Sequence, residues 1–396
     1  MYADPLFPVK MRSALYFSKT HKAKLKKERM NMRLIVVKIG SSSLTSDEGG
    51  LNRERIGFFA DEITSLIRSG AHVLLVTSGA VAAGFRAIGY TTRPKALHEK
   101  QAAAAVGQAL LMQAYNQAFG LHNIPTAQIL LTRYDFSNRR SVHNAQMTID
   151  ELLRRGVVPI INENDTVSVD ELKFGDNDTL SALVANLCKA QQLDIITDTD
   201  GLYTADPRHH SDARRLDRID AVTDEIFRIA GGAGSSVGTG GMRSKVEAAR
   251  IAMRGGVPVF IGRVTEPGDL RAAVAGTGKG TYFETRQHSL SMKKQWLGFH
   301  SLPKGTVLVD SGAEAALRSG GKSLLPVGIC EVEGDFHPGD VIEVINGERY
   351  PIGRGVSNYT SAQIRAVAGL STDEVQKRVD VQRIEVIHRD EWVTLN

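Results

Sequence analysis

The chain has 396 residues, 42% of them hydrophobic and 23% charged, with a formal net charge of +5. This is the composition of a globular protein with ample material for a core, and the length favours two or three domains. The sequence has no run of about 18 apolar residues, so we expect no membrane-spanning helix and no membrane partner.

The positive charge is concentrated in the first 30 residues. Eight basic and two acidic side chains give this segment a charge of +6, and the remaining residues together carry −1. The body of the protein is therefore close to neutral, unlike a surface built to bind nucleic acid. We interpret residues 1–31 as a basic extension, disordered or reflecting a misplaced start, with Met30 and Met32 as candidate starts.

The cysteines indicate the redox environment. Cys188 and Cys330 lie far apart in the sequence, and neither has a metal-ligand pattern beside it. We expect two free thiols in a reducing cytoplasm.

From residue 33 onward, short apolar runs alternate with helical patterns. The first run, 33–38, is followed by a helix pattern over 52–70 that Asn52 caps and Gly70 closes. An Ala-rich segment occupies 80–89. The same reading predicts helices at 143–156, 180–187 and 243–256, and strands at 72–79, 124–131, 157–165, 193–197 and 257–262.

This alternation predicts an α/β fold. Continuous apolar strands between helices are typical of a mostly parallel sheet that helices cover on both faces. Ligands of such sheets bind at the carboxyl ends of the strands. Because polar, Gly-rich segments follow several predicted strands, we expect one cleft built from several loops, at 38–43, 77–80, 161–165 and 197–201.

The pattern changes after about Phe283. A polar connector precedes short strand patterns punctuated by Gly, Pro and Asn, with one helix pattern near 313–320. This indicates a separate, small β-rich domain. The expected division is an α/β domain over 32–287, a linker over 288–303, the β-rich domain over 304–384 and a tail over 385–396.

Two glycine-rich segments with a lysine indicate phosphate binding. Lys38 is followed by a Gly/Ser loop whose backbone N–H groups can approach a phosphate, although this is not the Walker pattern. Lys245 lies in or near the first turn of a helix pattern that glycines precede, where a cation opposes the helix dipole unless an anion is bound. Together these features predict a phosphate site, while each alone also fits a structural turn.

The segment Gly175–Asp178 is more polar than a helix start requires. Asp178 is well placed as the N-cap of the following helix pattern, and one cap residue would suffice. Asp176 and Asn177 precede it on a loop at the ligand-facing edge. Because carboxylates repel phosphate, we interpret the acids as holding the two lysines in place, with Mg²⁺ as a further cation.

The remaining chemistry requires no nucleophile. The acidic segment 197–207 follows a strand, which gives it either a nucleotide-facing role or that of a simple hairpin turn. No histidine lies in a nucleophile–base motif or a metal cluster. A carboxylate is already ionised at neutral pH, so phosphoryl transfer to it needs only alignment and charge neutralisation by Lys and Mg²⁺.

In this order, the segments resemble the amino acid kinase family, most closely its glutamate 5-kinases. The resemblance covers about 33–285 and is carried by VVKIGSSSL, VTSGAVAAG, PIINENDTV, FGDNDTLSALVA, TDTDGLYTADPR and GTGGMRSKVEAA. The β-rich region resembles a PUA domain through GTVLVDSGAEAAL, SLLPVGI and RGVSNY. The resemblance implies the amino acid kinase fold. It also implies ATP-dependent phosphorylation of the L-glutamate γ-carboxylate to γ-glutamyl phosphate, the first step of proline biosynthesis.

The resemblance also implies roles for individual residues. Lys38 and Lys245 would stabilise the transferring phosphoryl group. Asp178 would orient these lysines, and Asp176 would join the same charged network near Mg²⁺, which ATP phosphates would mainly hold. The implied substrate-binding residues are Ser78, Gly79, Asn162, Asp165 and Asn177. The implied ATP-binding residues are Lys38, Gly40, Ser41, Thr197, Asp198, Thr239, Gly240, Gly241, Met242, Arg243, Ser244 and Lys245.

Within the substrate set, Asp165 suits an α-ammonium, whereas Ser78 and Asn177 can donate to carboxylates. The family further implies inhibition by proline, a homo-oligomer formed through the kinase domain and glutamyl-phosphate reductase as a possible downstream partner.

Two alternative functions stay open. One is another kinase of this fold, acting on aspartate, acetylglutamate, carbamate or UMP. The other is an RNA-binding regulatory protein, which the scarcity of clustered basic residues in 304–384 disfavours.

Overall fold

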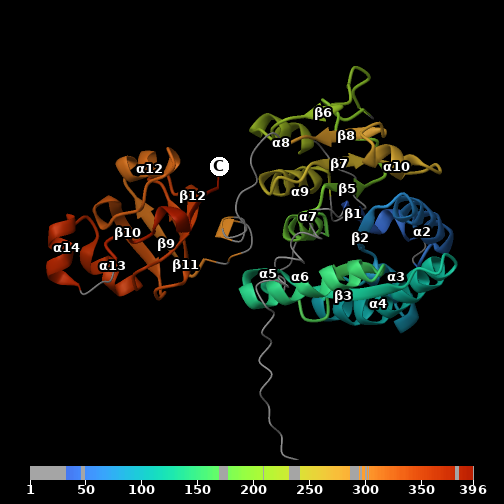
Figure 1. The fold of residues 1–396 in the computed structure, drawn as a ribbon, viewed down its shortest axis with the longest axis horizontal. Coiled ribbons are helices and arrows are strands. Elements are labelled where there is room, and N and C mark those ends of the chain that lie inside the picture. The colour runs from blue at the N-terminus through green and yellow to red at the C-terminus, as the bar shows by residue number, and fades with distance from the viewer. Residues whose placement is uncertain are drawn as a thin grey trace, which may run out of the picture.

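The computed structural model describes residues 33–45, 50–168, 177–207, 209–231, 241–285, 303–379 and 383–395, together with residues 294, 297, 298 and 301. The basic extension expected at 1–31 lies outside the described residues. Within the described part, no helix is both long and apolar enough to cross a membrane. The described residues form two sheets, one of eight strands before residue 286 and one of five strands after residue 303, which lie in separate parts of the ribbon (Figure 1).

The larger sheet has the strand order β3-β4-β2-β1-β5-β7-β8-β6. All neighbouring strands are parallel except β7 and β8, so the predicted mostly parallel sheet is confirmed. Its strands are β1 Leu34–Ile39, β2 His72–Val76, β3 Thr126–Leu131, β4 Val158–Glu163, β5 Gln192–Ile196, β6 Arg218–Ile219, β7 Val259–Gly262 and β8 Gly280–Phe283.

Helices cover both faces of this sheet (Figure 1). Helix α2 begins as predicted, because Oδ1 of Asn52 accepts a hydrogen bond from the backbone N–H of Arg55 at 3.0 Å. The described helices of this domain are α2 Arg53–Arg68, α3 Ala80–Gly84, α4 Leu97–Gly120, α5 Arg133–Ser137, α6 Arg139–Arg154, α7 Asn177–Cys188, α8 Asp224–Ala230, α9 Met242–Arg254 and α10 Asp269–Val274, with short 3-10 turns at Ser41–Ser43 and Arg86–Ile88.

Each face of the sheet has its own hydrophobic core, because side chains alternate along a strand. On β1, Val36 packs into the core that includes buried residues of α6, α7 and α9, whereas Val37 packs into the core that includes α2 and α4. Both valines are fully buried, and burial of each contributes about 1.5–3 kcal/mol. β1 is therefore a central strand fixed from both sides.

The second domain is built on the strand order β10-β9-β11-β12-β13. Its core surrounds fully buried aromatic side chains, Phe336 and Tyr359. The elements are β9 Gly305–Val309, α12 Ser311–Arg318, β10 Ile329–Gly334, β11 Val341–Ile345, β12 Pro351–Val356, α13 Ser361–Val367, α14 Thr372–Arg378 and β13 Trp392–Thr394, with 3-10 turns at Pro326–Gly328 and Arg389–Glu391. This is the separate β-rich sheet expected from the sequence.

The segment expected as a tail, 385–396, contributes to this domain. Strand β13 pairs antiparallel with β12, and Ile387 forms a bridge with Leu324. Ile387 and Trp392 are buried in the same core as Phe336. The apolar residues near the end of the chain are thus part of the sheet's packing.

Candidate active site

The carboxyl ends of neighbouring strands bring the predicted loops together. Lys38 on β1 is in register with Val76 on β2, and Ile39 is in register with Ile196 on β5. The segments that follow β1, β2 and β5 therefore leave the sheet side by side. Because chain connections diverge on the two sides of β1, this edge is a topological switch point, where ligands of open α/β sheets bind.

A buried carboxylate joins two lysines at this edge. Asp178, in the first turn of α7, is fully buried, and its Oδ1 forms an ion pair with Nζ of Lys38. Its Oδ2 lies 3.1 Å from Nζ of Lys245 on α9 and accepts a hydrogen bond from Oγ of Ser244 at 3.1 Å. Lys38 and Lys245 are themselves only 4% and 7% exposed, so both lysines are largely shielded from solvent.

The charges of this cluster are mutually dependent. Burial works to raise the pKa of Asp178, but the two ammonium groups outweigh burial and lower this pKa to about 2. The carboxylate therefore stays ionised at neutral pH. Among the contacts of the described residues, one carboxylate faces two ammonium groups, an arrangement that suits an anionic ligand.

The start of α9 adds backbone donors to this positive charge. The helix begins at Met242 after Gly241, which provides no side-chain cap to the first N–H groups. Lys245 lies in its fourth position, as the sequence indicated. A Cβ added to Gly40 would lie 3.5 Å from Nζ of Lys38, so the backbone of Gly40 lies beside this ammonium. This combination fits a phosphate group.

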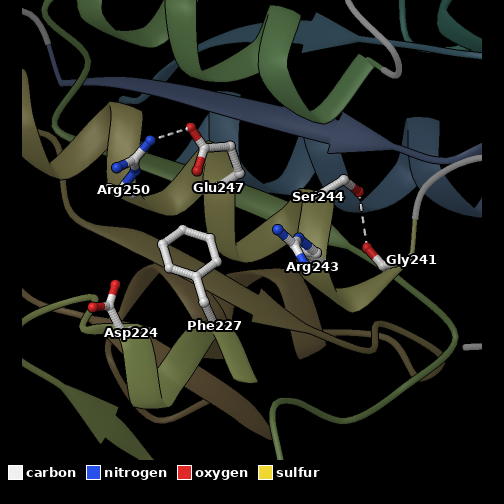
Figure 2. A pocket seen from close by; sticks show the side chains of 7 residues that line it. All are labelled: Asp224, Phe227, Gly241, Arg243, Ser244, Glu247 and Arg250. Carbon is white, nitrogen blue, oxygen red and sulfur yellow. Dashed lines mark hydrogen bonds and ion pairs between the residues drawn. The ribbon is translucent and has the colours of Figure 1, made fainter. Parts of the chain in front are cut away.

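A wide hollow opens beside the start of α9. It has a volume of about 700 Å³. Figure 2 shows the side chains that line it, which come from α8 and from the start and middle of α9. Gly241 and Ser244 belong to its wall near the lysine cluster, and Arg250 lies over the ring of Phe227 at 5.4 Å from the centroid. The remaining residues that line it are Asp224, Arg243 and Glu247.

A second group of polar side chains lies at the ends of β2 and β4. Nδ2 of Asn177 donates to the backbone O of Thr77 at 2.5 Å and to Oδ1 of Asn162 at 2.7 Å, and it lies 3.0 Å from Oγ of Ser78. The N–H groups of Asn177 are thus directed into the protein. This differs from the expectation that they donate to a substrate carboxylate. Gly79, which follows Ser78, has a φ of +103°, a backbone conformation that favours glycine.

Asp178 is not the helix cap that the sequence suggested. Helix α7 begins at Asn177, so Asp178 lies at its second position and its carboxylate faces the two lysines. Ionic attraction to two buried ammonium groups is stronger than a hydrogen bond to the helix backbone. Asp178 therefore contacts both lysines from the second position of the helix and not from its N-cap.

The other predicted residues fall into three groups. Gly40, Ser41, Ser78, Asn162 and Asn177 lie in the loops and strand ends around the lysine cluster. Thr197 and Asp198 follow β5 and are joined by a side-chain hydrogen bond of 3.0 Å, while Asp165 borders a small hollow with Glu163 and Gln108. Asp176, Thr239 and Gly240 lie outside the described residues.

Three contacting residues were not predicted. Thr77 accepts from Asn177, Gln108 accepts from Asn162, and Tyr115 contacts Thr77. Gln108 and Tyr115 lie on α4, a helix for which the sequence reading made no prediction. A polar side chain recurring every seven residues in an Ala-rich segment is the signal that would have found them.

The described residues contain no group of three His, Cys, Asp or Glu side chains that could hold a metal ion. Within the cluster, the carboxylate of Asp178 is already occupied by two ammonium groups. This donor set fits Mg²⁺ that is held mainly through the phosphates of a nucleotide, rather than in a cage of protein ligands.

Comparisons with known proteins identify the family of the chain. The family model "Amino acid kinase family" matches residues 33–263, and the model "PUA domain" matches residues 305–379. Proteins named glutamate 5-kinase from Geobacillus kaustophilus and Bacillus cereus are 49% and 47% identical over 367 residues. The match covers 92% of this chain and 98% and 100% of those proteins, respectively.

Among solved structures, carbamate kinase from Giardia lamblia is 18% identical, with a TM-score of 0.47 over 64% of this chain and 99% of that one. The family model covers more than half of the chain, and the two bacterial relatives are matched over nearly their full length. The chain therefore belongs to the amino acid kinase family, in the group of glutamate 5-kinases that carry a PUA domain.

Proposed function

We propose that the protein transfers the γ-phosphoryl group of ATP to the γ-carboxylate of L-glutamate, which forms γ-glutamyl phosphate and ADP. This reaction is the first step of proline biosynthesis. The observation that carries the proposal is the buried cluster of Lys38, Lys245 and Asp178 at the strand edge, in a chain 49% identical to a named glutamate 5-kinase.

The chemistry of the step fits these residues. An oxygen of the ionised γ-carboxylate forms a bond to the γ-phosphorus as the bond from phosphorus to the β–γ bridging oxygen breaks, and that oxygen leaves with ADP. No general base is required. The two lysines stabilise the charge on the transferring group, and Asp178 acts as a positioning residue that holds both ammonium groups in place. Mg²⁺, when bound with ATP, would supply further charge neutralisation.

ATP is expected to lie along the start of α9. Residues Gly241–Arg243 supply backbone N–H groups, and the same turn supplies the ammonium of Lys245 and the side chains of Arg243 and Ser244. The hollow of about 700 Å³ that continues from Gly241 gives room for the part of the nucleotide beyond the phosphates. Thr197 and Asp198 at the end of β5 are further candidates for this role, as are Gly40 and Ser41 after β1.

Glutamate is expected to lie at the ends of β2 and β4. Ser78, Gly79, Asn162, Asp165 and Asn177 are the proposed binding residues. Their support is the hydrogen-bonded arrangement that joins Asn177 to Ser78 and Asn162. Inhibition by proline, a homo-oligomer and a cytoplasmic location complete the proposal.

An RNA-binding role is not favoured by the second domain. Residues 304–384 contain nine basic and eleven acidic side chains. Several of the basic side chains are neutralised locally, since Arg318 pairs with Glu314 and Arg354 pairs with Glu343. A domain with this charge lacks the basic footprint of nucleic-acid recognition.

The function is tested by trapping the product. An acyl phosphate reacts with hydroxylamine, so the purified protein with ATP, Mg²⁺ and L-glutamate should form a hydroxamate together with an equal amount of ADP. Aspartate, acetylglutamate, carbamate and UMP are the competing substrates. Turnover of one of these in place of glutamate would overturn the proposal.

A further inference from the structure

One helix contacts several of the segments proposed to bind glutamate. Helix α4 carries three polar side chains at intervals of seven residues, Gln101, Gln108 and Tyr115. Seven residues are nearly two turns, so these side chains lie along one line of the helix. Each contacts a different segment at the carboxyl edge of the sheet.

The outer two contacts reach the segments that follow β2 and β4. Nε2 of Gln101 donates to the backbone O of Ser168 at 3.1 Å. The hydroxyl of Tyr115 lies 2.9 Å from Oγ1 of Thr77, and both residues are fully buried. Thr77 immediately precedes Ser78, and Ser168 follows the end of β4 by five residues.

The middle residue, Gln108, has hydrogen bonds at both ends of its side-chain amide. Nε2 of Gln108 donates to Oε1 of Gln128 at 2.9 Å, and Oε1 of Gln108 accepts from Nδ2 of Asn162 at 2.8 Å. One end of a carboxamide only donates and the other only accepts. The acceptor that Gln108 offers therefore receives the Nδ2 end of Asn162 and supports the orientation that the backbone N–H of Glu163 gives to its Oδ1 end.

Asn162 transmits this orientation to Asn177. Oδ1 of Asn162 accepts from Nδ2 of Asn177 at 2.7 Å and from the backbone N–H of Glu163 at 2.9 Å. The second N–H of Asn177 is directed to the backbone O of Thr77 at 2.5 Å. The end of Asn177 that can serve a ligand is consequently Oδ1, which is a hydrogen-bond acceptor.

Close packing keeps α4 in a fixed position relative to this group. A Cβ added to Gly107 would lie 1.8 Å from the backbone O of Ala80, and one added to Gly84 would lie 2.0 Å from the backbone O of Ala103. Helices α3 and α4 thus touch through their backbones. Since α3 begins two residues after Ser78, the helix that orients Asn162 is also fixed to the loop that holds Ser78.

We propose that Gln108 is a positioning residue that helps to hold the hydrogen-bonding polarity of the glutamate site, together with the backbone groups of Glu163 and Thr77. It acts through an amide relay formed by Gln128, Gln108, Asn162 and Asn177. The relay turns Oδ1 of Asn177 toward the α-ammonium of the substrate and keeps its N–H groups away from the α-carboxylate. The inference rests on the proposed glutamate kinase function, because it names the group of glutamate that Asn177 receives.

The test compares two substitutions of Gln108. Gln108→Met keeps the length of the side chain but removes the acceptor, whereas Gln108→Glu keeps an acceptor for Asn162. Kinetics with glutamate and ATP are measured beside inhibition by glutarate, which is glutamate without its ammonium group. In Gln108→Met, the KM for glutamate should rise about tenfold, while kcat, the KM for ATP and the inhibition constant of glutarate change less than about twofold. Gln108→Glu should bind glutamate nearly as the parent protein does.

Gln113→Met is the matched control, because Gln113 is exposed on the same helix, and it should leave all four constants unchanged. Equal weakening of glutamate and glutarate in Gln108→Met would overturn the relay, as would an unchanged KM for glutamate. If Gln108→Met does not fold, Gln108→Lys offers Asn162 a donor instead and should give the same selective loss of glutamate.

The outcome is separable from that of the proposed function. A parent protein without glutamate-dependent ADP formation would contradict the kinase activity and not the relay. In that case, calorimetric binding of glutamate and of glutarate to the parent protein and to Gln108→Met still decides the relay. Loss of glutamate binding alone supports it, and any other pattern contradicts it.

Discussion

The carboxylate of Asp178 on α7 lies 3.1 Å from the ammonium of Lys245 on α9, and both side chains are buried. The same carboxylate also pairs with Lys38, so a single acid holds cations from two separate elements. Removal of any one of these charges leaves the others unbalanced in a medium of low polarity. The cluster therefore links the stability of the fold to the chemistry of its site.

Replacement of Asp178 by Asn tests this link. The substitution leaves two ammonium groups close together without their anion, and we expect the free energy of unfolding at pH 7 to fall by about 3 kcal/mol. Denaturant unfolding measures the change. Asp212→Asn, at an exposed position, serves as the control and should change the free energy little. A stability equal to that of the parent protein would show that the lysines do not depend on this acid.

The pH dependence of the same cluster has a definite sign. The pKa of Asp178 is lowered from its ordinary value to about 2, so its contribution to stability is fully present above about pH 4 and is lost as the pH falls toward 2. Unfolding followed between pH 2 and pH 6 should therefore show a steeper acid loss of stability in the parent protein than in Asp178→Asn. Parallel curves would contradict this assignment.

Lys245→Ala should act on the chemical step. The ammonium is expected to stabilise charge on the transferring phosphoryl group, so its removal should lower kcat by roughly 100-fold or more, with the fold preserved as judged by circular dichroism. Lys322→Ala, an exposed substitution in the second domain, should have normal kinetics. Near-normal turnover of Lys245→Ala would sink the phosphate-site interpretation.

Arg243→Ala should act on nucleotide binding instead. Arg243 lines the hollow beside the start of α9 and is not bonded to the Asp178 cluster by the contacts of the described residues. We expect the KM for ATP to rise several-fold, with the KM for glutamate unchanged. A rise in the KM for glutamate with an unchanged KM for ATP would instead place the amino-acid site in this hollow.

A second buried acid predicts a stability effect of opposite sign. Burial raises the pKa of Asp194 on β5 to about 7, although a hydrogen bond from Gln192 works against the rise. The folded state holds this proton more tightly than the unfolded state, so the parent protein should lose stability as the pH rises from about 4 to 7. Asp194→Asn removes that titration. Its melting temperature relative to the parent should therefore be higher at pH 8 than at pH 5, and a constant difference would refute the assignment.

The contact between α3 and α4 predicts contrasting effects of one substitution. Gly107→Ala places a methyl group against the backbone O of Ala80 and should destabilise the protein by several kcal/mol or force the helices apart. Gly120→Ala, on the same helix with no atom within 4 Å of the added Cβ, should be neutral or slightly stabilising. Thermal unfolding of the two variants makes the comparison, and equal melting temperatures would contradict the packing.

The sequence predicted the elements in which hydrophobic periodicity and end signals agree. Residues 34–39 are mostly apolar and rich in β-branched side chains, and Asn52 caps the next helix in the structure as it does in the sequence pattern. Helix α4 was missed because its small apolar residues are distributed around the whole helix and give no stripe to recognise. Such a helix is specified by what packs around it, through long-range contacts that local patterns do not contain.

The candidate site shows the same division. Lys38 and Lys245 were recognised because glycine-rich segments mark places where backbone can approach a phosphate. The contact of Gln108 with Asn162 joins residues 54 positions apart and has no local signature. Asp178 illustrates an intermediate case, since its partners were inferred from charge, but the helix begins two residues earlier than an N-cap at Asp178 would imply, a usual uncertainty of helix ends.

Strand β13 makes the packing of the second domain depend on a segment that is synthesised well after the rest of its sheet. Trp392 is packed in the core of the domain, and β13 forms one edge of the sheet. The domain therefore cannot acquire its full packing before residue 392 has been synthesised, whereas the described strands of the larger sheet are all present by residue 283. A chain truncated before β13 would thus retain the larger sheet and expose apolar side chains that Trp392 covers in the second domain.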